Sequence, residues 1–327
     1  MKFKCLVVNQ KNKTCEIHQR QLADYSLLDS EVWIKSTYSG INYKDALGVT
    51  FTSPIYKKDN IVPGIDVAGY VYHSKSKKFK VGDLVLANGM GLGESFDGGY
   101  SEFVKIPDDK VILIPKGLSD QEAMILGTSG FTAALAVERM ILNGQTCSMG
   151  PILVSGATGG VGQFAIQILN QLGFFVEAVT SKLDNKNYLE RIGAHHVSLL
   201  KEHLVDVGPL EKAMFGGAID NLGGPFLESI IPKIELWGNV ASIGLALNPQ
   251  IKTTVMPFIL RGVSLLGASS NNCAMELRQK IWNQLASEWK PKFLKETLNQ
   301  IVSLNEVIEV SKTLMDHSHV GKTIIKF

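Results

Sequence analysis

The chain lacks paired cysteines and has no excess of charge of either sign. Of its 327 residues only four are cysteine, and none forms a C-x-x-C pair or stands at a metal-ligand spacing from a histidine. Free thiols and no bound metal are therefore expected. Lys and Arg number 33 against 31 Asp and Glu, so no net field would attract nucleic acid or an anionic membrane.

Long apolar runs are also missing. No stretch approaches the roughly 18 apolar residues that cross a bilayer, and the short apolar run in residues 1–9 turns polar too early for a signal-peptide core. A cytoplasmic protein with no membrane partner is expected. Hydrophobic residues make up 45% of the chain, which is typical of a globular protein, and the length allows two domains of ordinary size.

Residues 152–162 carry the clearest functional signal in the chain. An apolar strand runs into a turn that reads Gly-Ala-Thr-Gly-Gly-Val-Gly, and a helix opens near Gly160. The glycines let the backbone turn sharply and approach a pyrophosphate, while the start of the helix offers unpaired N–H groups to that anion. The segment therefore predicts a dinucleotide cradle.

The end of the next strand, residues 174–179, indicates which dinucleotide the cradle takes. In this kind of fold an Asp or Glu at that point bonds the 2′-hydroxyl of NAD. Here the chain reads Thr180-Ser181-Lys182. Two hydroxyls and a cation would pair with a 2′-phosphate that a carboxylate would repel, so the sequence favours NADPH.

The segments on either side of the cradle differ in character. Residues 1 to about 122 alternate short β-rich runs with Gly and Pro, which predicts a mainly β domain with a partly open barrel. A helix at about 120–142, with Ser119 and Glu122 as a capping box, is predicted to be the hinge between domains. After the cradle a strand–helix rhythm continues to about residue 270.

Apolar runs in this later part end in small or polar residues, as buried parallel strands do; they are 217–223, 238–244 and 263–267. The expected fold class is α/β, a doubly wound parallel sheet of Rossmann type joined to a β-rich barrel domain. Helices are expected at about 274–289 and 306–315. The final strand, 321–327, is predicted to return to the first domain.

Several motifs together resemble the medium-chain dehydrogenase/reductase superfamily. They are the late cradle, the turn at 80–83 and the Pro-Gly-Ile-Asp-Val-Ala-Gly segment at 63–69. Residues 42–47, Asn-Tyr-Lys-Asp-Ala-Leu, and residues 253–261 are similar to the quinone-oxidoreductase-like branch of acryloyl-CoA reductases, the AcuI/YhdH family. The resemblance covers nearly the whole chain.

The resemblance implies two domains. A GroES-like catalytic domain would comprise residues 1–122 together with 291–327, and an NADPH-binding Rossmann domain residues 123–290. Zinc-dependent members carry a catalytic Cys near Asn42, a His near Asp66 and a four-Cys lobe after about residue 90. None of these is present in the sequence, so a zinc-independent enzyme is expected.

The resemblance also implies hydride transfer from NADPH to the β-carbon of acryloyl-CoA, with an enolate that needs hydrogen-bond donors. The amide of Asn42 and the hydroxyl of Tyr43 are the candidate catalytic groups, and Tyr43 could equally bind the nicotinamide end. A purely structural role stays open for both. Asp45 and Asp66 are expected to anchor loops or pair with a lysine rather than transfer a proton.

Cofactor contacts are carried over residue by residue. They are Thr158, Gly159, Gly160, Val161 and Gly162 at the pyrophosphate, Thr180, Ser181 and Lys182 at the 2′-phosphate, and Leu245, Ile259 and Ser270 on the nicotinamide side. Relatives often carry Arg where Lys182 stands and a second Arg where this chain has Leu200. Lys binds a phosphate as a point charge without the bidentate fork of Arg, which weakens the expected preference for NADPH.

Two other functions stay open. One is an NADPH reductase of quinones or of α,β-unsaturated aldehydes and ketones, and the other is a nucleotide-binding protein without turnover. A basic rim would favour a CoA thioester, because CoA carries phosphates; the candidates are Lys44, Lys57, Lys58 and Arg261. A short-chain dehydrogenase is disfavoured, since no tyrosine has a lysine four residues later.

The assembly expected is a homodimer. The strand at 263–267, with the apolar segment 256–260 before it, would leave an unpaired edge at the end of the sheet. Pairing across a two-fold axis would close that edge. The alternative is that the helix at 274–289 covers the edge within one chain.

Overall fold

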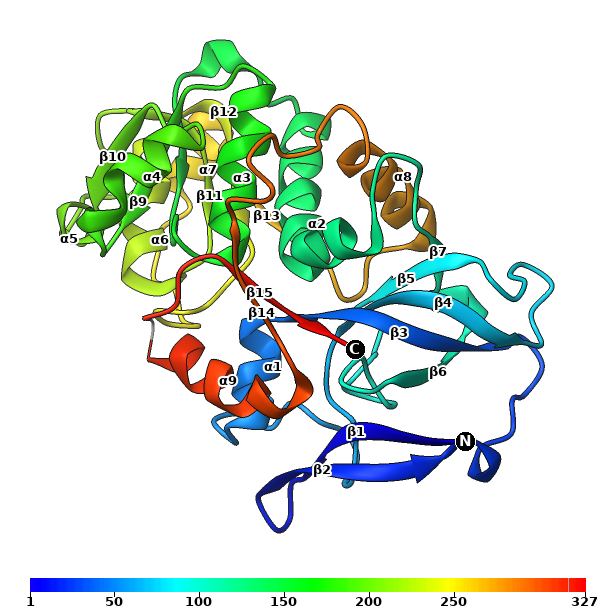
Figure 1. Ribbon diagram of the computed structural model, residues 1–327. Helices are drawn as coiled ribbons and strands as arrows, with labels where there is room; N and C mark the ends of the chain where they lie inside the picture. Colours follow the sequence, from blue (N-terminus) through cyan, green and yellow to red (C-terminus); the bar gives the residue numbers. More distant parts are fainter. Residues whose placement is uncertain (317) are drawn as a thin grey trace. The chain divides into compact units, whose positions relative to one another are not determined.

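The computed structural model describes residues 1–316 and 318–327, and the chain divides into two compact units (Figure 1). Unit 1 comprises Met1–Thr128, Ser270–Ser287 and Leu294–Phe327, and unit 2 comprises Ser129–Ser269 and Glu288–Phe293. The boundaries proposed from the sequence, 1–122 with 291–327 and 123–290, differ from these mainly at residues 270–287.

The helix α8 (Met275–Leu285) explains this difference. Arg278 donates to the backbone oxygen of Asn88 at 2.7 Å, and the indole N–H of Trp282 donates to the side-chain oxygen of Asn88 at 3.1 Å. Both side chains are fully buried. These bonds join α8 to the end of β5 in unit 1, and no local sequence pattern predicts them.

Unit 1 is built on a mostly antiparallel sheet with the strand order β14-β15-β3-β4-β5-β7, and β6 also pairs with β3. Its strands, with those of the separate β1-β2 hairpin, are β1 (Lys2–Asn9), β2 (Thr14–Gln21), β3 (Glu31–Ile41), β4 (Asp66–Ser74), β5 (Leu84–Asn88), β6 (Phe103–Pro107), β7 (Ile112–Leu113), β14 (Leu298–Val302) and β15 (Lys322–Lys326). The final strand β15 pairs antiparallel with β3, which confirms that it returns to the first domain.

The helices α1 (Tyr43–Val49) and α9 (Val307–Met315) lie beside each other in unit 1 (Figure 1). They share an apolar cluster with β1, to which Phe3, Val49 and Val307 contribute. The C-terminal segment is therefore built into the first unit by a helix as well as by a strand pair.

The helix α2 (Asp120–Leu142) has the bounds expected from the sequence. Its capping box is confirmed: the backbone N of Ser119 donates to Glu122 at 3.0 Å, and the backbone N of Glu122 donates to the Ser119 hydroxyl at 3.1 Å. Among the described residues α2 is also long and apolar enough to cross a membrane, which corrects the expectation that no such stretch exists. Its most apolar window is 78% buried, as in the core helix of a globular protein.

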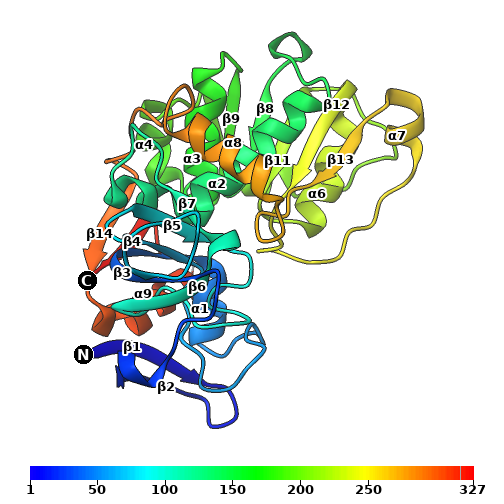
Figure 2. The same cartoon turned by 90° about the vertical axis from the view of Figure 1, so that its right-hand side faces the viewer.

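Unit 2 contains a parallel sheet with the strand order β10-β9-β8-β11-β12-β13, and Figure 2 shows its strands from β9 to β13. The order reverses between β8 and β11, as in a doubly wound sheet that binds a dinucleotide at that point, and the expected α/β class is confirmed. The strands are β8 (Ile152–Val154), β9 (Val176–Thr180), β10 (His196–Leu199), β11 (Phe215–Asp220), β12 (Ile234–Ser242) and β13 (Ser264–Gly267).

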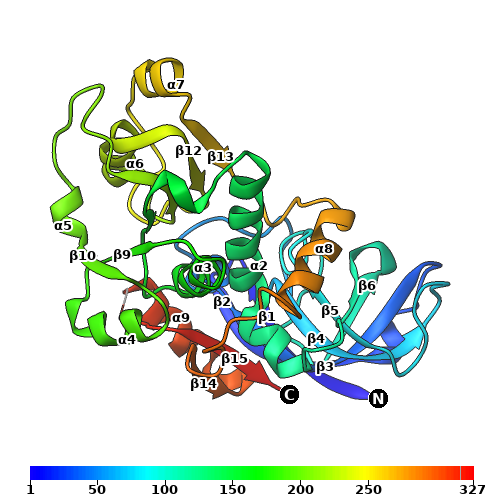
Figure 3. The ribbon, with the colours of Figure 1, turned by 90° about the horizontal axis from the view of Figure 1, so that it is seen from above.

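The helices of unit 2 are α3 (Gly160–Gln171), α4 (Lys186–Arg191), α5 (Leu200–His203), α6 (Gly224–Ile230) and α7 (Met256–Arg261). In Figure 3 α3 lies beside α2. Gly173 follows α3 with φ +82°, the left-handed conformation that commonly ends a helix. The glycine turn is thereby held between a buried strand and a well-defined helix.

Candidate functional site

The glycine turn joins β8 to α3 at the carboxyl edge of the parallel sheet. The backbone N of Ala157 donates to the oxygen of Val179 at 3.1 Å, and the N of Gly159 donates to the oxygen of Gly156 at 2.9 Å. Because α3 begins at Gly160, its first N–H groups have no partner within the helix and can bind an anion.

Two of the predicted glycine contacts are needed for packing within the protein. A Cβ on Gly162 would lie 2.4 Å from the oxygen of Gly156, and one on Gly160 would lie 2.8 Å from the hydroxyl of Ser129 in α2. From the sequence, the absence of a side chain at Gly160 was explained by the close approach of a pyrophosphate. In the structure, the side chain of Ser129 occupies the space that a Cβ on Gly160 would need. Gly159 is exposed, and its Cβ would meet one atom at 3.2 Å, so backbone is open to a ligand at this glycine.

Three polar residues that the sequence reasoning missed fix the strand ends beside this turn. The buried carboxylate of Asp220 accepts from the Ser155 hydroxyl at 2.9 Å, and the backbone N of Asn221 donates to that same hydroxyl at 2.8 Å. Burial raises the pKa of Asp220. The signal available in the sequence was a carboxylate placed directly at the end of an apolar run.

The predicted 2′-phosphate residues follow β9 in unit 2. Thr180 is buried and its hydroxyl accepts from the backbone N of Lys182 at 3.0 Å. Ser181 is exposed and Lys182 is half-buried. A serine and a lysine therefore follow the strand directly, and their side chains are of the kind that would pair with a 2′-phosphate.

Of the three nicotinamide-side predictions, Leu245 and Ser270 each follow by three residues the paired strand ends Ser242 of β12 and Gly267 of β13, whereas Ile259 lies on α7. Leu245 is exposed in the loop after β12, and Ser270 belongs to unit 1, where its backbone oxygen accepts from Arg278 at 2.6 Å. Ile259 is 72% exposed on α7. Arg261, at the end of α7, donates to the oxygen of Ile234 at the start of β12. This places α7 by the amino edge of the sheet, opposite the cradle, and argues against Ile259 as a cofactor contact.

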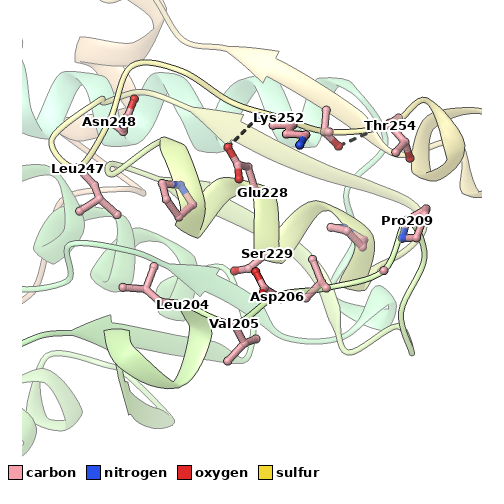
Figure 4. Close-up of a pocket in the computed structure, with 15 residues that line it drawn as sticks. Leu204, Val205, Asp206, Pro209, Glu228, Ser229, Leu247, Asn248, Lys252 and Thr254 are labelled. Carbon is pink, nitrogen blue, oxygen red and sulfur yellow. Dashed lines mark hydrogen bonds between the residues drawn. The ribbon is translucent and has the colours of Figure 1, made fainter.

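A separate hollow of about 620 Å³ lies in unit 2 between residues 204–209, α6 and residues 247–254 (Figure 4). Glu228 faces the 247–254 segment and accepts from the backbone N of Lys252 at 2.8 Å. None of the predicted site residues lines it. The hollow is therefore distinct from the cradle.

In unit 1 a buried polar cluster surrounds Asn42. The side-chain N of Asn42 donates to Asp45 at 3.1 Å and to Asp66 at 2.8 Å, and its side-chain oxygen accepts from Nζ of Lys322 at 2.5 Å. Carboxylates at one end and an ammonium at the other fix the orientation of the amide. Both amide hydrogens are used inside the protein, which favours the structural role that was left open for Asn42 over donation to an enolate.

Asp66 is held by two further elements. The backbone N of Thr128 donates to its two oxygens at 3.1 and 3.0 Å, and the Thr128 hydroxyl donates at 2.6 Å. This approach needs the kink in α2 at Gly127, which has φ 47° and leaves no room for a Cβ, 2.5 Å from Asp66. Nζ of Lys322 lies 3.9 Å from Asp66, so Asp66 pairs with a lysine as expected.

Burial sets the protonation of this cluster. Burial, and then the charge of Asp66, raise the pKa of Asp45 to about 6. Burial lowers the pKa of Lys322, although the two carboxylates oppose it. Tyr56 and Tyr100 are buried beside the cluster, and burial and then the charge of Asp45 raise the pKa of both, so neither hydroxyl ionises near neutral pH.

Tyr43 follows Asn42 in the chain and is the first residue of α1. Asp45 accepts from the backbone N of Asn42 at 3.1 Å and from the backbone N of Ile65 at 3.0 Å, which ties the first turn of α1 to the segment before β4. Tyr43 is half-buried. Its hydroxyl is the candidate proton donor that is left once Asn42 is assigned to the network.

The basic rim expected for CoA is largely engaged within the protein. Nζ of Lys44 lies 2.5 Å from Glu94, and Lys57 lies 3.9 Å from the same carboxylate. Arg261 donates to three backbone oxygens, one of them that of Pro232 at 2.8 Å. Among the described residues no group of three or more His, Cys, Asp and Glu side chains could hold a metal ion.

Comparisons with known proteins agree with this architecture. Two family models match the chain, the alcohol dehydrogenase GroES-like domain over residues 28–116 and the zinc-binding dehydrogenase over residues 160–287. The acrylyl-CoA reductase AcuI of Ruegeria pomeroyi is 37% identical over 289 residues, which are 88% of this chain and 88% of that protein.

Two solved structures match this chain over 100% of its length and over 100% of their own. The Bacillus subtilis protein YhfP with NAD bound is 38% identical with a TM-score of 0.95. The YhdH oxidoreductase from Salmonella enterica in complex with NADP is 33% identical with a TM-score of 0.94.

Proposed function

This chain belongs to the medium-chain dehydrogenase/reductase superfamily of oxidoreductases, and from that premise we propose that it reduces the activated C=C bond of acryloyl-CoA, or of a similar enoyl thioester, with NADPH. Sequence similarity to the Ruegeria reductase supports the substrate class. The product of acryloyl-CoA would be propionyl-CoA.

The residues of unit 2 fit the cofactor. NADPH supplies a hydride when bound. The start of α3 and the open backbone at Gly159 would hold its pyrophosphate, and Ser181 with Lys182 would hold its 2′-phosphate. The NADP complex of the Salmonella oxidoreductase supports this choice, whereas the NAD complex of YhfP makes the preference over NADH worth measuring.

The residues of unit 1 serve the second half of the reaction. After hydride has added to the β-carbon, negative charge collects on the thioester oxygen and the α-carbon takes a proton. Tyr43 is the residue proposed to donate that hydrogen bond or proton. Asn42 positions Tyr43 through the buried cluster, in which Lys322 donates to the side-chain oxygen of Asn42.

We also propose that the reaction needs no zinc. The Asn42 cluster offers two carboxylates, one amide and one ammonium, and no thiol or imidazole takes part in these bonds, whereas zinc favours such donors. Activity should therefore survive exhaustive treatment with EDTA. Loss of turnover that added zinc restores would contradict this.

The buried network that fixes the Tyr43 helix is the observation that carries the proposal, and NADPH oxidation tests it. Acryloyl-CoA, crotonyl-CoA, a small quinone and an alkenal are compared as acceptors, and the highest kcat/KM is expected for acryloyl-CoA. Tyr43→Phe should lower kcat by about 10²-fold or more. Tyr38→Phe is the matched control, because Tyr38 is also half-buried in unit 1, and it should leave kcat unchanged.

A quinone or enone reductase is the second candidate. The engagement of Lys44 with Glu94, and of Arg261 with backbone oxygens, favours it, because these cations are then not offered to the phosphates of CoA. A kcat/KM for the quinone or the alkenal above that for both CoA thioesters would select this candidate.

A cytoplasmic homodimer completes the proposal. The strand β13 is at the end of the sheet order, and Leu265 on it is 37% exposed. Ile259 and Leu260 on α7, the helix before β13, are also exposed, and an unpaired strand at the edge of a sheet is a template for pairing with a second copy. Light scattering should give twice the mass of one chain, and Leu265→Lys should give a monomer. Leu204→Lys, at another exposed leucine of unit 2, should stay a dimer.

A further inference from the structure

Gln163 links the glycine turn to the helix that follows the 2′-phosphate residues. Its side chain is 1% exposed. Its side-chain N donates to the oxygen of Thr158 at 2.9 Å and to that of Gly159 at 3.3 Å, and its side-chain oxygen accepts from the hydroxyl of Tyr188. Both ends of one buried amide are therefore bonded, one end to the turn and the other to α4.

Tyr188 holds the opposite end of this link. The short helix at Leu183–Asn185 and then α4 follow Lys182 directly. The backbone N of Asn185 donates to the oxygen of Lys182 at 3.1 Å, and the ring of Tyr188 lies 5.7 Å from the guanidinium of Arg191. The hydroxyl of Tyr188 thus bonds the segment that begins at Lys182 to Gln163 of α3, the helix that follows the glycine turn.

The bonds through Gln163 bear on the cofactor because one dinucleotide must reach both places. The pyrophosphate would lie at the turn and the 2′-phosphate at Ser181 and Lys182, so the spacing of the two would decide whether both contacts can form at once. A spacing that is fixed before binding spares the entropy of ordering the loop. NADH makes no use of that spacing, since it has no 2′-phosphate.

We propose that Tyr188 and Gln163 are positioning residues that set the preference for NADPH over NADH, an inference that rests on the proposed function. Tyr188 acts only on the 2′-phosphate segment. Gln163 acts on this segment and on the glycine turn, because it also donates to the backbone oxygens of Thr158 and Gly159.

The test measures dissociation constants of the full-length protein for NADPH and for NADH by fluorescence titration. Tyr188→Phe keeps the ring beside Arg191 and removes only the hydroxyl. It should weaken NADPH by about fivefold or more and leave NADH within about twofold. In the Lys182→Ala background the same change should add no further loss, because the phosphate contact is already gone.

Gln163→Leu should weaken both cofactors, since the oxygens of Thr158 and Gly159 lose their donor, and it should weaken NADPH more than NADH, since Tyr188 loses its acceptor. Gln167→Leu is the matched control: Gln167 is one turn further along α3, 2% exposed, and accepts from the backbone N of Phe293 at 2.9 Å. It should lower the melting temperature and leave the ratio of the two dissociation constants unchanged. A merely structural role for Tyr188 would give this same pattern and would overturn the inference.

The two proposals fail in different ways. A wild-type protein that reduces an enoyl-CoA with NADPH, together with a Tyr188→Phe variant of unchanged cofactor ratio, overturns the positioning role alone. A wild-type protein that binds neither dinucleotide overturns the proposed function and this inference with it.

Discussion

The two candidate sites differ in how far along the chain their parts lie. The cradle is assembled almost wholly from neighbours, since Gln163 is five residues from the carbonyl of Thr158 that it holds. The cluster in unit 1 joins Asn42 to Lys322 across 280 residues and Asp66 to Thr128 across 62. One site can therefore be read as a motif, and the other exists only once the chain is folded.

The two sites differ as well in how much charge they bury. The cradle offers backbone N–H groups and a half-buried Lys182, so little charge is removed from water. The cluster buries Asp45, Asp66 and Lys322, each at most 2% exposed, and such charges are tolerated only while each keeps its partners. Changes in the cluster should therefore affect folding, and changes in the cradle should affect binding.

The largest effect is expected from Lys322→Met. It leaves two buried carboxylates without their cation, which costs about 3–5 kcal/mol, and the melting temperature should fall by roughly 10 °C. Thermal unfolding followed by circular dichroism measures this. NADPH affinity at 20 °C should stay within about twofold of the wild type, because the cradle lies in unit 2.

Lys326→Met is the control for this change, since Lys326 is on the same strand but exposed. It should leave the melting temperature unchanged. Equal effects of the two substitutions would show that the loss came from β15 itself and not from the buried charge.

Local patterns predicted most of the frame. The cradle, the bounds of α2 with its capping box, the three later strands and the return of β15 all rest on residues close together in sequence, where periodicity and caps act. The contacts of Asn42 could not be predicted from the sequence for the opposite reason. Its donors are taken by two carboxylates whose positions depend on β4 and on the first turn of α1.

Lys322 and Thr128 were missed because nothing near them signals chemistry. Lys322 is a lysine in an ordinary terminal strand, and only the pairing of β15 with β3 brings it to Asn42. The division of the chain differs at residues 270–287 for the same reason, because Arg278 and Trp282 bond to a residue nearly two hundred positions earlier. A buried contact of this separation leaves no pattern in a single sequence.

A pH titration sharpens the same comparison with a smaller effect. The pKa of Asp45 is about 6 in the folded protein against 3.8 for a free side chain. Because the folded value is raised, the stability that neutral Asp45 contributes is complete below about pH 4 and is lost as the pH rises through 6. The free energy of unfolding of the wild type minus that of Asp45→Asn should fall by roughly 2–3 kcal/mol across this range.

Urea unfolding at several pH values between 4 and 7 gives this difference curve. Asp109→Asn, at an exposed position, should give a flat difference curve against the wild type. A flat curve for Asp45→Asn as well would mean that Asp45 is not desolvated in the folded protein.

The smallest effect, and the one confined to the cradle, is expected from Lys182→Ala. Loss of one charge-assisted contact at a half-buried position should weaken NADPH about tenfold, or about 1.4 kcal/mol. NADH should be almost untouched, since it lacks the 2′-phosphate.

Fluorescence titration of both cofactors with the wild type and the variant measures the change, and the wild type should prefer NADPH by at least about tenfold. The melting temperature should not move, because Lys182 is half-buried and takes no part in the buried cluster of unit 1. Equal wild-type affinities for the two cofactors would show that Ser181 and Lys182 do not read the 2′-phosphate. A fall in stability equal to that of Lys322→Met would remove the contrast between a site that binds and a cluster that folds.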